Sequence, residues 1–151
     1  MNQSGNDDRV LLRPAMEDDS DIILKWQSQD QTRLHFHEPC IPTPQEHANW
    51  FKKCLEDPDR QLNIIIHNGS RVGAIRLDKA GENCLEVSIM IAPECYRLGI
   101  GTAALNEARK LWPKEILKAE VLPGNEASHA LFRKCGYEQQ GKGLYINRPG
   151  Q

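Results

Sequence analysis

The sequence predicts a single α/β domain with a mixed, largely antiparallel sheet and about four helices. Three observations support this prediction. The length of 151 residues fits one domain. Strand-like segments gather in the middle of the chain, around the hairpin signal Asn68-Gly69. From Gly101 onward the apolar residues recur with the period of a helix instead of a strand.

The sequence of the N-terminal part predicts a strand followed by two helices. Val10–Leu12 is a short apolar run that Pro14 ends, and residues 22–26 carry apolar side chains at helical spacing behind an acidic cluster. Thr43 and Glu46 form a capping box that begins the second helix. Residues 1–8 are polar and are expected to be a flexible segment, so the domain is expected to span residues 9–148.

The middle of the chain predicts an antiparallel meander. Its three strands are Leu62–His67, Val72–Leu77 and Cys84–Ile91, joined by Asn68-Gly69 and by a turn over Ala80–Asn83. The C-terminal part predicts, in order, a helix from Gly101, a strand over Ile116–Val121, a helix from Asn125 that Gly136 ends, and a strand over Leu144–Asn147.

Composition excludes several classes of protein. Nineteen basic and 21 acidic residues leave a formal charge of -2, whereas proteins that bind nucleic acid usually carry a basic surplus. No apolar run is long enough to span a bilayer. The five cysteines form no CxxC pair, so neither a disulfide scaffold nor a zinc ribbon is expected. We therefore expect a cytoplasmic protein without nucleic-acid, membrane or metal partners. We also expect a monomer or homodimer.

The most informative stretch is the glycine turn after the strand Cys84–Ile91. Gly99 and Gly101 let the backbone approach a ligand, and the amide groups of the turn and of the helix that follows suit a pyrophosphate. The pattern GxGxxA also matches a dinucleotide fingerprint, in which Glu120 would bind a ribose. However, Pro93–Leu98 separates the strand from the first glycine, and only about 50 residues follow, too few for a doubly wound nucleotide domain. An ordinary glycine turn is the third possibility.

Two blocks of sequence resemble the GNAT superfamily of N-acetyltransferases. Gly99 and Gly101 match its acetyl-CoA pyrophosphate loop, with Tyr96 at the usual Gln/Arg position and Arg97 supplying the basic charge one place later. The segment Asn125–Tyr137 resembles the family's Asn-x-x-Ser…Gly-Phe helix. The resemblance implies the GNAT fold, in which the fourth and fifth strands pair in parallel, and acetyl transfer from acetyl-CoA to an amine.

The resemblance also implies roles for individual residues. Glu86, on the fourth strand, would be the general base, and a backbone amide near Ile89, Met90 and Ile91 would hold the thioester oxygen. The pyrophosphate would meet the turn, and two residues of the last helix would contact the coenzyme. These coenzyme contacts are Arg97, Leu98, Gly99, Ile100, Gly101, Thr102, Asn125 and Ser128. Asn125 also fits a simple helix N-cap.

The general acid is the weak point of the match. Phe132 stands where many members of the superfamily have a tyrosine, so Tyr137 or a water molecule is expected to protonate the leaving thiolate. Without an acid, a non-catalytic module that binds acyl-CoA is the alternative of another class.

The acceptor is suggested by a narrower likeness to N-acetyltransferases of nucleotide-linked amino sugars, of the pseudaminic-acid type. The likeness runs through Trp26, Arg33, His47, Trp50 and the segment Glu86–Ile89. It implies that Arg33, His47 and Ser88 contact the acceptor, and that Arg76 could meet its phosphates. His47 also fits a packed helix histidine. Acetyltransferases of ribosomal-protein N-termini, of small antibiotics and of polyamines remain alternatives.

Overall fold

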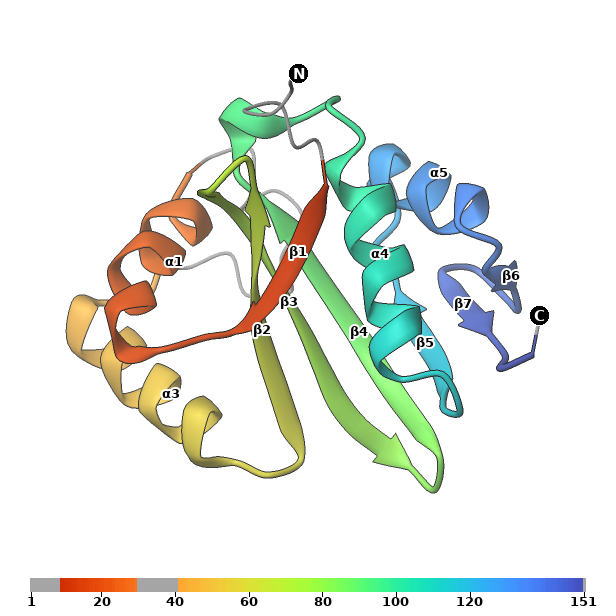
Figure 1. Ribbon diagram of the computed structural model, residues 1–151, viewed down its shortest axis with the longest axis horizontal. Helices are drawn as coiled ribbons and strands as arrows, with labels where there is room; N and C mark the ends of the chain where they lie inside the picture. Colours follow the sequence, from red (N-terminus) through yellow and green to blue (C-terminus); the bar gives the residue numbers. More distant parts are fainter. Residues whose placement is uncertain (1–8, 30–40, 151) are drawn as a thin grey trace, which may run out of the picture.

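A computed structural model describes residues 9–29 and 41–150 of the chain. One seven-stranded sheet forms its centre, with α1 and α3 to one side and α4 and α5 to the other (Figure 1). The predictions for Arg33 and for the segment 1–8 lie outside the described residues.

The strands follow the order β1-β2-β3-β4-β5-β7-β6 across the sheet. Their bounds are Val10–Pro14 (β1), Arg60–His67 (β2), Ser70–Gly81 (β3), Cys84–Ile91 (β4), Ile116–Glu120 (β5), Glu138–Gln139 (β6) and Leu144–Asn147 (β7). Among the strands that the structure describes, only β4 and β5 pair in parallel, so the predicted mixed, largely antiparallel sheet is confirmed. The two-residue strand β6 was not predicted, because it carries no periodic signal.

The central meander has the predicted hairpins. Asn68 and Gly69 have φ angles of 53° and 78°, as a tight two-residue turn between β2 and β3 requires. The strand β3 continues past the predicted end at Leu77 to Gly81. Its polar end pairs with the first residues of β4, so the second turn shrinks to Glu82 and Asn83.

Within the described ranges, four helices span Ser20–Gln27 (α1), Pro44–Glu56 (α3), Ile100–Leu111 (α4) and Glu126–Lys134 (α5), and two 3₁₀ turns span Glu17–Asp19 (η1) and Pro93–Cys95 (η2). The helix α3 begins at the predicted capping box: Thr43 Oγ1 accepts from the Glu46 amide at 3.1 Å, and Glu46 Oε1 accepts from the Thr43 amide at 2.8 Å. Gly136 follows α5 with φ of 84°, the left-handed conformation that ends many helices.

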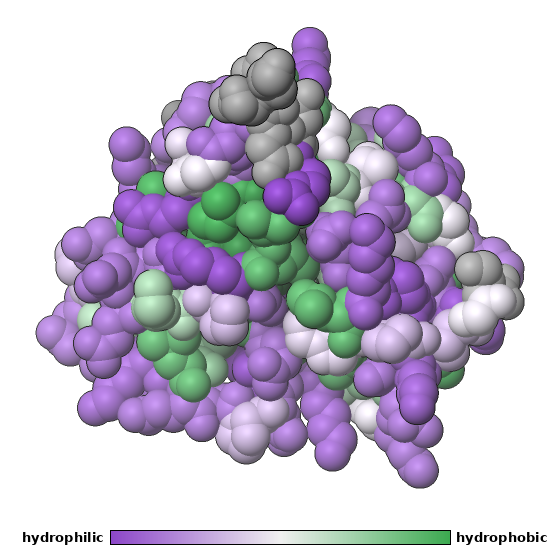
Figure 2. All heavy atoms as spheres, viewed as in Figure 1, coloured by the Kyte–Doolittle hydropathy of each residue, from purple (hydrophilic) through white to green (hydrophobic). Residues whose placement is uncertain are grey.

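Two apolar cores lie on opposite faces of the sheet. The larger one joins the sheet to α4 and α5 and contains Leu105, Leu117 and Phe132. The smaller one joins it to α1 and α3 and contains Trp26 and Phe51. Most of the remaining surface is hydrophilic, although apolar side chains come to the surface over β1, where Leu11 is 47% exposed (Figure 2).

The parallel pair β4–β5 is short. Its register covers Cys84–Glu86 against Ile116–Lys118 and then stops, although β4 continues for five residues to Ile91. In the described strands, the edge of β4 that faces β5 therefore has no strand partner beyond Glu86. The antiparallel pairing of β4 with β3 continues without interruption from Leu85 to Ile91, so its side chains alternate regularly between the two faces.

A buried carboxylate ties the start of α1 to the sheet. Asp19 is 1% exposed, and its two oxygens accept from Arg13 of β1 at 2.8 and 2.9 Å. Arg71 of β3 and the Met16 amide donate to the same carboxylate at 3.1 and 2.8 Å. Chiefly because of the hydrogen bonds from Arg13, the pKa of Asp19 falls to about 2.

This carboxylate should make stability depend on acid pH. Because the folded-state pKa lies below the unfolded value, the contribution is complete above about pH 5 and is lost as the pH falls through about 2. Asp19→Asn should lower the free energy of unfolding at pH 7 by about 2 kcal/mol. Urea titrations of both proteins should show this difference shrinking between pH 5 and pH 2. A difference that does not change with pH would contradict the assignment.

Candidate active site

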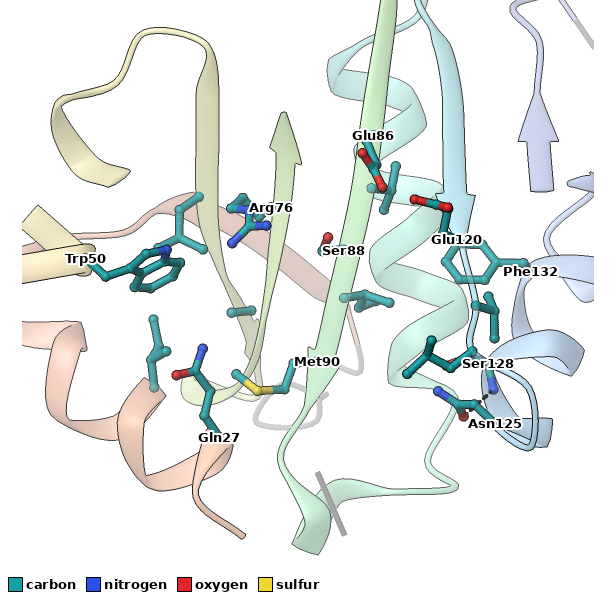
Figure 3. A pocket seen from close by; sticks show the side chains of 17 residues that line it. Gln27, Trp50, Arg76, Glu86, Ser88, Met90, Glu120, Asn125, Ser128 and Phe132 are labelled. Carbon is teal, nitrogen blue, oxygen red and sulfur yellow. Dashed lines mark hydrogen bonds between the residues drawn. The ribbon is translucent and has the colours of Figure 1, made fainter. Parts of the chain in front are cut away.

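A cavity of about 630 Å³ opens on the sheet where β4 and β5 separate (Figure 3). Seventeen residues from α1, α3, β2, β3, β4, β5, α5 and the loop before α5 line it. The lining consists of Ile23, Gln27, Trp50, Leu62, Ala74, Arg76, Glu86, Val87, Ser88, Ile89, Met90, Glu120, Val121, Leu122, Asn125, Ser128 and Phe132.

The strand β4 supplies the centre of the cavity. Glu86, Ser88 and Met90 share the face of the sheet that α1 and α3 cover, as the predicted alternation requires. Val87 and Ile89 belong to the opposite core but also border the cavity, because the missing strand pairing exposes the edge of β4. Ile91 packs against the core on the α4 side and does not belong to the lining.

A second carboxylate lies across the gap from Glu86. Glu120 ends β5, and its side chain points toward that of Glu86 (Figure 3). The register explains this arrangement: Glu86 pairs with Lys118, and Glu120 lies two residues further along the same face of β5. From the sequence, Glu120 was considered only as a ribose-binding acid. The sequence predicts the parallel pairing but not the register that brings Glu120 beside Glu86.

The other end of the cavity combines an aromatic ring with an arginine. The Arg76 guanidinium carbon lies 5.7 Å from the centroid of the Trp50 ring, and Arg76 Nε donates to Asp78 Oδ2 at 2.9 Å. The terminal nitrogens of Arg76 make no hydrogen bond to the described part of the chain. Figure 3 shows Trp50, Arg76 and Gln27 gathered on this side. Trp50 and Gln27 were not predicted to belong to the site.

The glycine turn lies between η2 and α4. Arg97 and Gly99 have φ angles of 65° and 77°, both in the left-handed region. Gly99 is the N-cap of α4 and has no side-chain cap, so the first amide groups of the helix are free to bind an anion. A Cβ atom at Gly99 would meet no atom of the described residues within 4 Å, so the space beside this backbone is open among them.

The second glycine of the turn has a packing role. A Cβ atom at Gly101 would lie 3.1 Å from Cδ2 of Leu131, so Gly101 lets α4 approach α5 closely. Ile100 is 2% exposed in the core, whereas Leu98 is 62% exposed on the turn. Asn125 caps α5 by accepting from the Ser128 amide at 3.3 Å, and both residues also line the cavity.

The structure does not bring the predicted acid to the cavity. Tyr137 is 6% exposed in the core on the α4 side, and its ring meets that of Phe132 edge-on at 5.0 Å. Among the described residues its hydroxyl has no hydrogen-bond partner, and burial raises its pKa far above the ordinary value. Phe132 lines the cavity and also belongs to the core that contains Tyr137.

Replacing Tyr137 with phenylalanine therefore tests the acid directly. We expect turnover to stay within about twofold, and stability to be unchanged or to rise by up to about 1 kcal/mol, because the substitution removes a buried hydroxyl without a partner. Steady-state kinetics and thermal melts of the two proteins measure both effects. A large loss of turnover with unchanged melting would instead identify Tyr137 as the proton donor.

His47 holds two helices together. It is 3% exposed, its Nε2 lies 3.0 Å from the Ser20 carbonyl oxygen of α1, and its ring is 5.7 Å from that of Trp50. Burial lowers the pKa of His47, so the neutral ring is favoured near pH 7. His47 is absent from the cavity lining, although its ring packs against that of Trp50, which belongs to the lining. In the structure, His47 is therefore a packed helix histidine.

In the part of the chain that the structure describes, no group of three or more His, Cys, Asp or Glu side chains is placed to hold a metal ion. No helix in residues 9–29 or 41–150 is long and apolar enough to cross a membrane.

The Glu86 carboxylate, the free edge of β4 and the glycine turn before α4 follow one another along the chain. The model of the acetyltransferase (GNAT) domain family matches residues 9–138, and the chain belongs to this family. The predicted fold is confirmed, and so is the predicted family of GNAT acetyltransferases.

Individual relatives are distant. An uncharacterized protein of Methanocaldococcus jannaschii is 24% identical over 147 residues, which cover 92% of this chain and 30% of that protein. The chain thus spans about a third of the length of this relative.

Solved structures share the fold at low identity. The aminoglycoside acetyltransferase AAC(6')-Ib in complex with ribostamycin and coenzyme A has a TM-score of 0.84 and 18% identity, covering 95% of both chains. The spermidine N-acetyltransferase of Vibrio cholerae, in complex with CoA and spermine, has a TM-score of 0.80 and 19% identity, covering 93% of this chain and 89% of that one. The ribosomal L7/L12 acetyltransferase RimL has a TM-score of 0.80 and 10% identity, covering 95% and 96%.

Proposed function

We propose that the protein acetylates a primary amine that binds in the cavity, with Glu86 as the general base. The observation that carries this proposal is the end of the β4–β5 pairing at Glu86. At that position a carboxylate stands at the start of a free strand edge, inside the cavity. A base and free backbone amides side by side are what amine acylation needs.

The residues around the gap fit acetyl-CoA. The open, Cβ-free backbone at Gly99 and the uncapped start of α4 suit a pyrophosphate, held by amides over residues 97–102. The free edge of β4 at Ile89–Ile91 can bond the extended arm, and Asn125 and Ser128 border its path. When bound, acetyl-CoA supplies the acetyl group as a thioester.

Glu86 moves the proton in the proposed reaction. An aliphatic amine arrives mostly protonated at pH 7, so a carboxylate oxygen of Glu86 takes one ammonium proton, directly or through water. The freed lone pair forms the new C–N bond while the C–S bond breaks. The acetylated nitrogen then releases its second proton, which reaches the leaving thiolate through water. Glu120 adds a second negative charge that attracts the ammonium group, and Ser88 lies on the same face to orient it.

For the acceptor, we retain a nucleotide-linked amino sugar as the working hypothesis. Arg76 and Trp50 support it, because a guanidinium and an aromatic ring at one end of the cavity suit a phosphate and a planar ring. The paired carboxylates Glu86 and Glu120 favour a second candidate, a cationic amine such as those bound by the neighbours with ribostamycin and spermine.

A thiol-release assay over a panel of amines tests the proposed function. The panel contains amino sugars, a nucleotide-linked amino sugar, spermidine, an aminoglycoside and an N-terminal peptide. We expect amine-dependent release of CoA, with the acetylated product identified by mass spectrometry. If acetyl-CoA binds but no amine in the panel is acetylated, the protein is the non-catalytic acyl-CoA-binding module.

A further inference from the structure

We propose that Arg76 is an anion-binding specificity residue, so that the acceptor is an amine that also carries a carboxylate or a phosphate. The inference rests on the proposed function and names the class of acceptor for the same site. It follows from the way Arg76 is held and from the charges on its face of the sheet.

Two contacts hold the Arg76 side chain in place. Its Nε donates a hydrogen bond to Asp78 at 2.9 Å, and its guanidinium lies over the Trp50 ring. The two terminal nitrogens remain without a partner in the described part of the chain, while the side chain lines the cavity and is 26% exposed. A guanidinium held this way presents a pair of parallel donors, which matches the oxygens of a carboxylate or phosphate.

The cavity has opposite charges at its two ends. Arg76 pairs with Ser88 across β3 and β4, and Glu86 is its diagonal neighbour on the same face. Diagonal neighbours on an antiparallel pair lie about 7–8 Å apart. Glu120 adds to the negative end. A molecule with an ammonium at one end and an anion several ångströms away therefore meets complementary charges at both, whereas a linear polycation meets Arg76 as a like charge.

Matched acceptor pairs test this inference. In each pair, one amine carries an anionic group (the anionic member) and its analogue lacks that group (the neutral member). The pairs are O-phosphoethanolamine with ethanolamine, glucosamine 6-phosphate with glucosamine, and β-alanine with β-alaninamide. We expect a higher kcat/KM for the anionic member, and the phosphate and carboxylate pairs show which group is preferred. Arg76→Gln should lower kcat/KM for the anionic member by about 10- to 100-fold, mainly through KM, and leave the neutral member within about threefold.

Two further variants separate recognition from structure. Arg60 also contacts Asp78, at 4.0 Å, and lies outside the cavity lining, so Arg60→Gln is the matched control and should not change the preference within a pair. Arg76→Lys keeps the charge and should restore part of the preference. Equal losses for both members in Arg76→Gln, or a neutral amine or spermidine preferred by the unmodified protein, would overturn the inference.

A binding measurement tests the anion site at Arg76 even if no amine in the panel is acetylated. With the coenzyme site saturated by CoA, UDP and malonate are titrated by calorimetry as a diphosphate and a carboxylate probe. We expect at least one of them to bind and its affinity to fall about 10-fold or more in Arg76→Gln. No binding to the CoA-loaded protein, or equal binding by the variant, would overturn the anion site. Absence of acetylation with intact anion binding would instead contradict the proposed function.

Discussion

Replacing Glu86 with glutamine should lower kcat by about 10²- to 10⁴-fold, the range that a positioned general base supplies. The substitution keeps the size and the hydrogen-bonding capacity of the side chain but removes its ability to accept a proton. The affinity for acetyl-CoA should stay within about twofold, because Glu86 lies at the start of the free edge of β4 and not at the glycine turn. Thiol release and calorimetric titration measure the two quantities.

Two other glutamates make this prediction specific. Glu120→Gln should mainly raise KM for the acceptor, because Glu120 lines the same cavity as Glu86 but lies on β5 instead of β4. Glu82→Gln changes an exposed residue of the turn before β4 and should have no effect. If Glu120→Gln removes turnover and Glu86→Gln does not, Glu120 is the base. Equal loss of turnover and of coenzyme affinity in Glu86→Gln would remove its assigned role.

Replacing Gly99 with valine should weaken acetyl-CoA binding by about 100-fold or more while the fold persists. A β-branched residue is strained at φ of 77°, and its side chain would fill the open space that the pyrophosphate needs. The cost to stability should be about 1–2 kcal/mol, the cost of a left-handed conformation for a residue with a Cβ atom. Coenzyme titrations and thermal melts separate the two effects.

Gly101 is the natural comparison for this variant. A Cβ atom at Gly101 meets the end of the Leu131 side chain instead of open space, so Gly101→Ala should affect the packing of α4 on α5 more than coenzyme binding. If both variants bind acetyl-CoA as the unmodified protein does, the pyrophosphate does not lie on this turn.

Local signals in the sequence predicted most of the fold. Three of these signals depend only on residues close by in the sequence, and the structure shows each as expected. They are the capping box at Thr43, the hairpin at Asn68-Gly69 and the glycine after α5. The extra length of β3 and the short strand β6 depend on pairing with the strand that follows each of them, β4 and β7, and no pattern within either segment specifies it.

The site was only partly predictable for the same reason. Glu86 and Ser88 follow from the alternation of one strand, and Asn125 from a cap, so their places on the cavity agree with the sequence. Trp50 and Glu120 come from segments that meet β4 only in the folded chain. Tyr137 was selected as one of few tyrosines, and the direction of its side chain depends on how α5 packs in the core.

Hydrogen exchange with and without acetyl-CoA tests the central claim most directly, namely that the coenzyme lies along the free edge of β4 and on the glycine turn. The account predicts that acetyl-CoA slows exchange of amides in Val87–Ile91 and in residues 97–102, with no change in the distant β1–β2 hydrogen bonds. Saturating acetyl-CoA that leaves both segments unprotected, or that protects other strands instead, would contradict it.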